Sequence, residues 1–216
     1  MQAVHSSSAL AVNLFGYWRN HGSIEPLLRA CRLAHIREAH LEFEAQLPIA
    51  DILNRRKFPV DPHIDVLIKG ISFHLGIESK FSEAYCYRGH KGLKRAYLAW
   101  ESLWMDIPDS RQLGEEISPI DHQYSHLHPA QLLKHILGLK HACRGKREFM
   151  LLYLWYDVPF KEGEEHRKEI ERFGKIMKKD GIKFQAITYQ ELILEISRLN
   201  RSEHQDYVNY ITERYL

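Results

Sequence analysis

Alternation of apolar and polar residues predicts strands in the first third of the chain. The run 41–47 alternates with period two, as a half-buried strand does, and Pro48 helps to end it. A second strand is predicted at 63–69 and a third at about 72–81. Gly70 lies between these two strands and is a natural turn residue, so we expect them to form a hairpin.

Apolar residues at helical spacing predict helices on both sides of this hairpin. In the first helix, Leu27 and Leu28 follow Glu25 and Pro26, which favour a helix start. Pro129 is likewise suited to a first helical turn. The predicted helices lie at about 25–34, 93–104, 129–139, 164–179, 190–199 and 203–210.

The second half of the chain completes an α/β pattern. Residues 149–156 are a continuous apolar run of strand length, which predicts an interior strand covered on both faces. A further strand is predicted at 182–188 and a loop at 114–128. This order of elements is typical of a mixed central sheet flanked by helices, with an α-β-β-β-α-β core. We expect a single domain over 1–216, with its core at about 24–188, an N-terminal extension and C-terminal helices.

Composition and charge limit the classes of partner. Of the 216 residues, 44% are hydrophobic and 27% are charged, as in soluble globular proteins. The net charge is only +2, so any affinity for nucleic acid has to come from a local basic surface. Three cysteines without a CxxC pair favour neither a disulfide framework nor a structural zinc site. No segment has the pattern of a signal peptide or of a membrane helix, and we expect a cytoplasmic protein without membrane contact.

Charged residues on the predicted hairpin point to metal-dependent chemistry. Glu78 and Lys80 are two residues apart in one strand and share a face of the sheet, while the hairpin brings Asp65 beside Glu78. Two converging carboxylates attract a hard cation such as Mg²⁺. Lys80 is placed to orient or activate a water against a phosphodiester and to stabilise the developing negative charge. The alternative is a solvent-exposed hairpin face, because Glu-x-Lys triplets also occur by chance.

The segments that carry these residues resemble a known group of nucleases. PHIDVLIKG followed by LGIESKF is similar to the D…(D/E)xK core of the PD-(D/E)XK superfamily, which includes restriction endonucleases and repair nucleases. The nearest proline before the aspartate is Pro62, displaced from its usual adjacent position. The segments LEFEAQLPI, ESKFSEAY, QLLKHILGL and LLYLWYD resemble, more narrowly, a restriction-endonuclease-like group of prokaryotic proteins. This resemblance extends to about Phe173 and implies a restriction-endonuclease-like fold.

The resemblance also implies roles for individual residues. Asp65 and Glu78 are expected to bind the metal together with the backbone carbonyl of Ser79, and Lys80 to serve the attacking water. The implied cofactor is Mg²⁺, with Mn²⁺ as the alternative ion, and the implied substrate is DNA. Gln131, with His135, resembles a helix glutamine that supports the site in several nuclease branches, although a solvent-facing glutamine is an equal alternative.

An auxiliary acid is implied as well, and three glutamates compete for this role. Glu44 matches a position that is often acidic in the group, Glu42 shares its strand face, and Glu38 is the candidate if the acid comes from the first helix. An exposed strand glutamate is the alternative interpretation of Glu44.

The function expected from these features is a metal-dependent DNA endonuclease acting in restriction, phage defence or repair. Because duplex cleavage often needs two active sites, a homodimer is a reasonable expectation. The alternatives are a nucleic-acid-binding module that does not cut, and a protein-interaction domain with Trp100 and Trp104 on its surface. The helical spacing of these tryptophans favours a position in the core instead.

Two further groups of residues carry weaker signals. The histidines of the predicted loop, His122, His126 and His128, have no spacing typical of a zinc site. A basic segment near Tyr85 and Tyr87 is a candidate contact for a phosphate backbone, although such a run is more often a solvated surface. Its basic residues are Arg88, His90, Lys91, Lys94 and Arg95.

Overall fold

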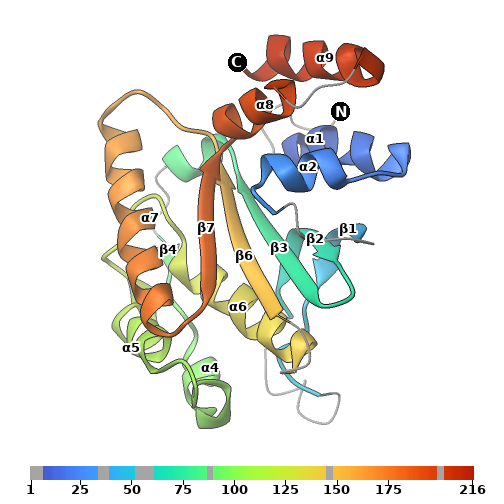
Figure 1. Cartoon of the computed structure of the whole chain (residues 1–216). Coiled ribbons are helices and arrows are strands. Elements are labelled where there is room, and N and C mark those ends of the chain that lie inside the picture. Colours follow the sequence, from blue (N-terminus) through green and yellow to red (C-terminus); the bar gives the residue numbers. More distant parts are fainter. Residues whose placement is uncertain (1–6, 34–38, 52–60, 87–89, 145–147, 199–201) are drawn as a thin grey trace.

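A five-stranded mixed sheet forms the centre of the computed structural model (Figure 1). The structure describes residues 7–33, 39–51, 61–86, 90–144, 148–198 and 202–216. In spatial order the strands are β1 (His40–Gln46), β2 (His63–Lys69), β3 (Phe73–Lys80), β6 (Glu148–Trp155) and β7 (Lys183–Thr188). The expected α/β architecture with a mixed sheet between helices is confirmed.

Strand directions follow the predicted connections. β1, β2 and β3 are antiparallel neighbours, whereas β3, β6 and β7 run parallel. The hairpin between β2 and β3 is closed by a hydrogen bond from the Gly70 amide to the Phe73 carbonyl, at 2.8 Å, and it pairs Val66 with Ile77. β6 lies between β3 and β7, which confirms the predicted interior strand.

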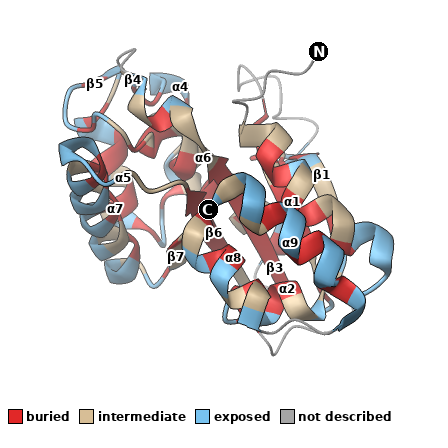
Figure 2. Ribbon diagram, turned by 90° about the horizontal axis from the view of Figure 1, so that it is seen from above, coloured by how far each residue is buried: buried red, intermediate tan, exposed pale blue. Residues whose placement is uncertain are grey.

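Helices cover the sheet on both faces, and Figure 2 shows the two groups on either side of the strands. One face carries α5 (Pro108–Glu116), α6 (Pro129–Cys143) and α7 (Lys161–Lys179). The other face carries α1 (Ser7–His21), α2 (Glu25–Ala30), α8 (Tyr189–Arg198) and α9 (Gln205–Tyr215). In the described part of the chain, no helix is long and apolar enough to cross a membrane.

The two faces have separate hydrophobic cores. The α6 core includes Leu132, Leu139, Leu151 and Tyr153. The α8 core includes Leu14, Leu28, Ile77, Leu152 and Leu192. Successive residues of β6 alternate between them, because side chains of a strand point to opposite faces.

Two glycines allow α6 to lie close to the sheet. A Cβ atom at Gly138 of α6 would lie 2.6 Å from Leu47 Cβ and 2.9 Å from the Leu47 carbonyl oxygen. A Cβ atom at Gly76 of β3 would lie 2.8 Å from Leu139 Cδ1. These distances are shorter than ordinary van der Waals contact, so larger residues would push the helix away from the strands.

The N-terminal segment, for which the sequence analysis predicted no helix, contains the helix α1. Leu10, Leu14 and Trp18 recur every four residues and are buried in the α8 core. This spacing is a helical stripe, and packing against β3 gives it a partner. The following helix, α2, ends at Ala30, short of the predicted end near residue 34, which lies outside the described residues.

The predicted helix at 93–104 is wrong as a continuous element. It consists of the single turn α4 (Arg95–Leu98) and a 3₁₀ turn, η2 (Glu101–Leu103). Trp100, between them, has φ −106° and ψ 85°, which interrupts the helix. Trp104 is 1% exposed and donates its indole N–H to the Tyr97 carbonyl at 2.9 Å, whereas Trp100 is half-buried against the same core. The core position expected for Trp104 is confirmed.

The predicted loop at 114–128 is partly structured. α5 extends into it as far as Glu116, and β5 (Ile120–Asp121) pairs with β4 (His90–Lys91). The remaining short elements are the 3₁₀ turns η1 (Ser82–Tyr85) and η3 (Ser202–His204).

Candidate active site

Glu78 and Lys80 meet at the end of β3. Both side chains lie on the sheet face that α6 covers, and Lys80 Nζ is 2.5 Å from Glu78 Oε1. The side chain of Glu78 is 1% exposed and that of Lys80 is 15% exposed. This burial excludes the alternative of a solvent-exposed hairpin face, because both charges are enclosed by protein.

Helix α6 adds an imidazole to this pair. His135 Nε2 lies 2.8 Å from Glu78 Oε2, and the imidazole is 1% exposed. The two atoms are close without the alignment of a hydrogen bond, and His135 Nδ1 has no hydrogen-bond partner among the described residues. Sequence reasoning noted His135 only beside Gln131. Its position one helical turn after Gln131 was the available signal.

Asp65 reaches the same end of the hairpin from β2. Its Oδ2 atom accepts a 2.7 Å hydrogen bond from the backbone N–H of Ser79, the residue between Glu78 and Lys80. The pairing of Val66 with Ile77 places Asp65 level with Glu78. The structure therefore brings the three residues of the predicted triplet and its aspartate into one cluster.

The electrostatics of the two acids differ. Burial, reinforced by the negative charge of Glu78, raises the pKa of Asp65 to about 7. Burial also acts to raise the pKa of Glu78, but the positive charges of Lys80 and His135 outweigh it and hold this pKa at about 2. For Lys80, burial favours the neutral amine, yet the charge of Glu78 prevails and raises the pKa of the ammonium group. Glu78 is thus ionised and Lys80 is protonated at neutral pH.

Glu44 lies on β1 beside Asp65 and has an unusual backbone. Its φ is +49°, a left-handed value that is strained for a residue with a side chain. Leu41, before it, packs in the α8 core, and Ala45, after it, packs in the α6 core, so the strand changes faces at this point. The Glu44 carboxylate is exposed and accepts a 3.0 Å hydrogen bond from Ser8 Oγ, and its charge contributes to raising the pKa of Asp65.

The other candidate acids lie elsewhere. Glu42 forms an ion pair with Lys69 at 2.7 Å, and His40 and Lys69 are cross-strand partners toward the far end of the β1–β2 ladder. Glu38 lies outside the described residues. Of the three glutamates, Glu44 is therefore the one that the described structure places beside Asp65.

The side chains of Ser79 and Gln131 make no described contact with Glu78 or Lys80. The Ser79 hydroxyl points to the opposite face of the sheet, where it lies 2.6 Å from the Tyr189 hydroxyl and 3.2 Å from the Ser7 carbonyl. Gln131 is half-buried in the first turn of α6, and no described hydrogen bond joins its side chain to Glu78 or Lys80. His135 occupies the contact with Glu78 on that helix.

A basic cleft lies near the cluster, since the charges of Glu78 and Lys80 act on residues that line it. It has a volume of about 250 Å³ and is lined by Lys91, Lys94, Lys134 and His128, together with Asp61 and Tyr97. Burial is the main cause that lowers the pKa of His128 to about 4, and the charges of Lys134 and Lys80 add to this effect. Burial also lowers the pKa of Lys134, against the opposing influence of Glu78. The charges of Lys80 and Glu78 therefore affect the pKa values of residues in the cleft. The group of Asp65, Glu78, Lys80 and His135 is called the active-site cluster below.

Part of the predicted basic segment contributes to this cleft. Lys91 and Lys94 line it, Arg95 is exposed in α4, and Arg88 lies outside the described residues. Lys134, from α6, was not singled out by the sequence, because a single lysine in an amphipathic helix is usually a solvated residue.

The predicted loop histidines do not gather into a metal site. His126 Nδ1 lies 3.0 Å from the Ala84 carbonyl oxygen, and His128 Nε2 lies 3.1 Å from the Lys91 carbonyl oxygen. His122 is exposed. Among the described residues, the group of side chains with metal-ligand spacing is a different one, formed by His21, Glu203 and His204.

The donor set of the active-site cluster fits a hard divalent cation. Asp65 and Glu78 offer carboxylate oxygens, the ligand type that Mg²⁺ prefers. Glu78 Oε2 is buried and makes no aligned hydrogen bond among the described residues, although His135 Nε2 lies 2.8 Å from it. A cation between the two acids would also relieve the repulsion that raises the pKa of Asp65.

The protein is thus of the α/β class, and two carboxylates and a lysine meet at the end of its mixed sheet. The whole chain, residues 1–216, matches the model of a protein family described as Restriction Endonuclease associating with ARP. The chain belongs to this restriction-endonuclease-like family. No curated protein and no solved structure matches the chain.

Proposed function

We propose that this protein is a Mg²⁺-dependent DNA endonuclease of the PD-(D/E)XK type, with a role in restriction, phage defence or repair. The observation that carries the proposal is the contact of Glu78 with Lys80 at the end of β3, with Asp65 hydrogen-bonded to the intervening Ser79 amide. Membership of a restriction-endonuclease-like family supports the reaction class.

Asp65 and Glu78 would hold the cation between β2 and β3. When bound, Mg²⁺ supplies Lewis-acid polarisation of the phosphodiester and activation of the attacking water. The hydrogen bond from the Ser79 amide fixes one oxygen of Asp65 and leaves the other oxygen for the ion. The strained backbone of Glu44 places a further carboxylate near Asp65, where it serves as an outer acid.

Lys80 acts as a positive charge and not as a general base. Its pKa is raised by the charge of Glu78, so the ammonium group keeps its proton at neutral pH. A protonated lysine donates hydrogen bonds and has no lone pair to accept a proton. We therefore assign to Lys80 the orientation of the water and the stabilisation of negative charge on the phosphate in the transition state.

The basic cleft provides a place for the DNA backbone. Lys91, Lys94 and Lys134 converge there, beside the cluster. Phosphate contacts of this kind supply most of the sequence-independent affinity for DNA and make it dependent on salt. The small net charge of the chain is compatible with this function, because the positive charge is concentrated next to the site.

The decisive experiment compares two lysines of the same hairpin. Lys80→Met keeps most of the side-chain volume but removes the charge, and Lys69→Met is the matched control, since Lys69 also pairs with a glutamate but is 42% exposed. Single-turnover cleavage of supercoiled plasmid, linear duplex and RNA is measured with Mg²⁺, with Mn²⁺ and with chelator. Lys80→Met is expected to slow cleavage of DNA by about a hundredfold or more, as for loss of one electrostatic stabiliser.

Several outcomes would contradict the proposal, provided that circular dichroism shows folded protein. Cleavage by Lys80→Met at the wild-type rate would show that the triplet is not catalytic. DNA binding by the wild-type protein without cleavage in either metal ion would support a binding module instead. Preferential cleavage of RNA would leave the site assignment standing and overturn the assigned substrate.

A further inference from the structure

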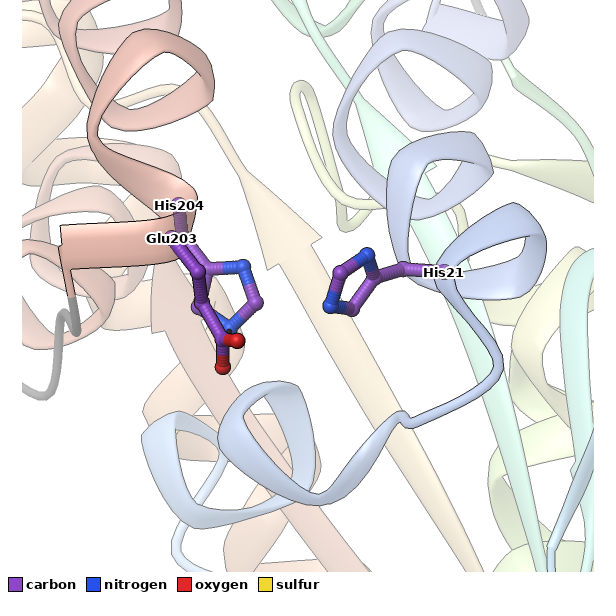
Figure 3. A group of neighbouring side chains, drawn as sticks. All are labelled: His21, Glu203 and His204. Atoms are coloured by element: carbon purple, nitrogen blue, oxygen red, sulfur yellow. Dashed lines mark ion pairs between the residues drawn. The ribbon is translucent and has the colours of Figure 1, made fainter.

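A second cluster of metal-ligating side chains lies on the opposite face of the sheet from α6. His21 ends α1, and Glu203 and His204 belong to η3, which leads into α9. Their ligand atoms all lie within 4.8 Å of one another. Figure 3 shows the imidazole of His21 directed toward the side chains of Glu203 and His204. His204 Nε2 lies 3.3 Å from Glu203 Oε1.

The imidazole of His204 is held by its surroundings. Its side chain is 4% exposed, and its Nδ1 atom lies 2.9 Å from the Tyr17 hydroxyl. Tyr17 also stacks on His21, with ring centroids 5.5 Å apart, and on Tyr207, at 4.0 Å. When Nδ1 donates its proton to the Tyr17 oxygen, the lone pair of Nε2 is directed toward Glu203. In metal-binding histidines, a hydrogen bond from one ring nitrogen fixes the orientation of the ring and leaves the other nitrogen free to bind the metal.

We propose that His21, Glu203 and His204 bind a divalent transition-metal ion, with Zn²⁺ the ion that the ligands fit best. Two imidazole nitrogens and one carboxylate form a ligand set typical of zinc, whereas Mg²⁺ prefers oxygen ligands alone. The cluster opens on a pocket of about 140 Å³ that Glu25 and Arg29 also line, so a water molecule can enter as the fourth ligand.

The spacing requires only a small adjustment. Zinc bonds of 2.0–2.2 Å in a tetrahedron separate the ligand atoms by roughly 3.4 Å. The pair formed by Glu203 and His204 already has this spacing, and no separation in the group exceeds 4.8 Å. His21 is exposed at the end of its helix, so its side chain can move by the roughly 1 Å that closure demands.

A metal at this position would connect the two ends of the described chain. α1 and α9 both pack into the α8 core, and the cluster joins the last residue of α1 to the turn that precedes α9. The inference does not depend on the proposed nuclease activity, because its residues come from other elements and from the other face of the sheet. We expect the ion to stabilise the packing of these terminal helices.

The test is a titration of the full chain with Zn²⁺ alone, by calorimetry and by thermal unfolding. His21→Ala is the test variant, and His40→Ala is its matched control, since His40 is also exposed and lies 3.9 Å from a glutamate. Wild type and His40→Ala are expected to bind one Zn²⁺ at this site and to melt at higher temperature with the metal. His21→Ala is expected to bind it about tenfold more weakly or worse, since even outer partners of metal ligands contribute this much.

The titration is repeated in Asp65→Asn to separate this site from the active-site cluster. Retained Zn²⁺ binding in Asp65→Asn, lost again on addition of His21→Ala, supports the proposal whatever the cleavage assays show. The proposal is overturned if wild-type protein binds no Zn²⁺ at micromolar concentration. It is equally overturned if His21→Ala binds the ion as tightly as wild type does.

Discussion

Among the described residues, a glutamate lies beside a histidine both at the end of β3 and in the cluster of His21, Glu203 and His204, and these two clusters differ in what surrounds the pair. Glu78 and His135 are each 1% exposed and are joined by Lys80 and Asp65. In the second cluster Glu203 is exposed, and its companions are His204 and a further imidazole, that of His21. The same two residue types therefore occur in a closed cluster, formed by Asp65, Glu78, Lys80 and His135, and in an open cluster, formed by His21, Glu203 and His204.

This difference decides which chemistry each cluster supports. Around Glu78, a second carboxylate would supply oxygen ligands for the proposed hard cation, and a lysine would supply positive charge for a phosphate. Around Glu203, a second imidazole would supply nitrogen ligands for the proposed softer ion. The position on the fold matters as well, because β3 and α6 hold the first cluster inside a packed core, whereas the second lies where helices end.

The largest effect that distinguishes the clusters is expected from loss of one histidine. His135→Ala removes the imidazole that lies against the buried Glu78 carboxylate and leaves a cavity, which should lower the free energy of unfolding by about 3 kcal/mol. This corresponds to roughly 6–12 °C in melting temperature for a chain of this size. His21→Ala, without added metal, should change it by less than about 0.5 kcal/mol, as at other exposed positions. Thermal and urea unfolding measure both values, and equal effects would remove the contrast between a closed and an open cluster.

A second effect, with a defined pH dependence, is expected at Asp65. Its pKa rises from 3.8 to about 7 on folding, so between these values the folded state holds a proton that the unfolded state has released. Stability then falls with rising pH across this window and levels off above about pH 7. Asp65→Asn removes this penalty and still accepts the hydrogen bond from the Ser79 amide.

The measurement is the melting temperature of metal-free Asp65→Asn and wild type between pH 4 and pH 8. The variant should melt at higher temperature at pH 8, and its advantage should shrink as the pH falls toward 4. The control is His21→Ala. Because this variant retains Asp65, the difference between its melting temperature and that of wild type should not follow this trend with pH. A difference that is constant across the range would show that Asp65 is ionised normally in the folded protein.

The smallest effect is expected from loss of the hydrogen bond between Tyr17 and His204, which holds one imidazole of the open cluster. Tyr17→Phe removes the hydroxyl that contacts His204 Nδ1 but keeps the ring that stacks on His21 and Tyr207. Loss of this hydrogen bond should cost about 1 kcal/mol of stability without metal. Zn²⁺ affinity, measured by calorimetry, should fall by about tenfold, the lower end of the effect of outer partners. An unchanged affinity would mean that Tyr17 does not orient the ring.

Local patterns in the sequence determined the strands and the central motif. Period-two alternation indicated β1, and Gly70 indicated the hairpin that brings Asp65 level with Glu78. Strand parity also put Glu78 and Lys80 on one face. These features depend on residues close in the chain, and for this reason they are visible without a structure. The helix α1 belongs to the same kind, because the spacing of Leu10, Leu14 and Trp18 was already present in the sequence.

Only the tertiary structure decided which distant residues meet. His135 reaches Glu78 because Gly76 and Gly138 allow α6 to lie close to the sheet, a result of packing between segments far apart in the chain. The left-handed backbone at Glu44 likewise breaks an alternation that looked regular in the sequence.

The open cluster is the strongest case of this dependence on tertiary structure. His21 and His204 stand near opposite ends of the chain, and no spacing rule connects them. Burial of α1 and α9 in a common core brings them together, and that burial is set by the sum of many apolar contacts. Sequence periodicity describes each helix separately, whereas the meeting of their ends is fixed only when both helices pack on the same face of the sheet.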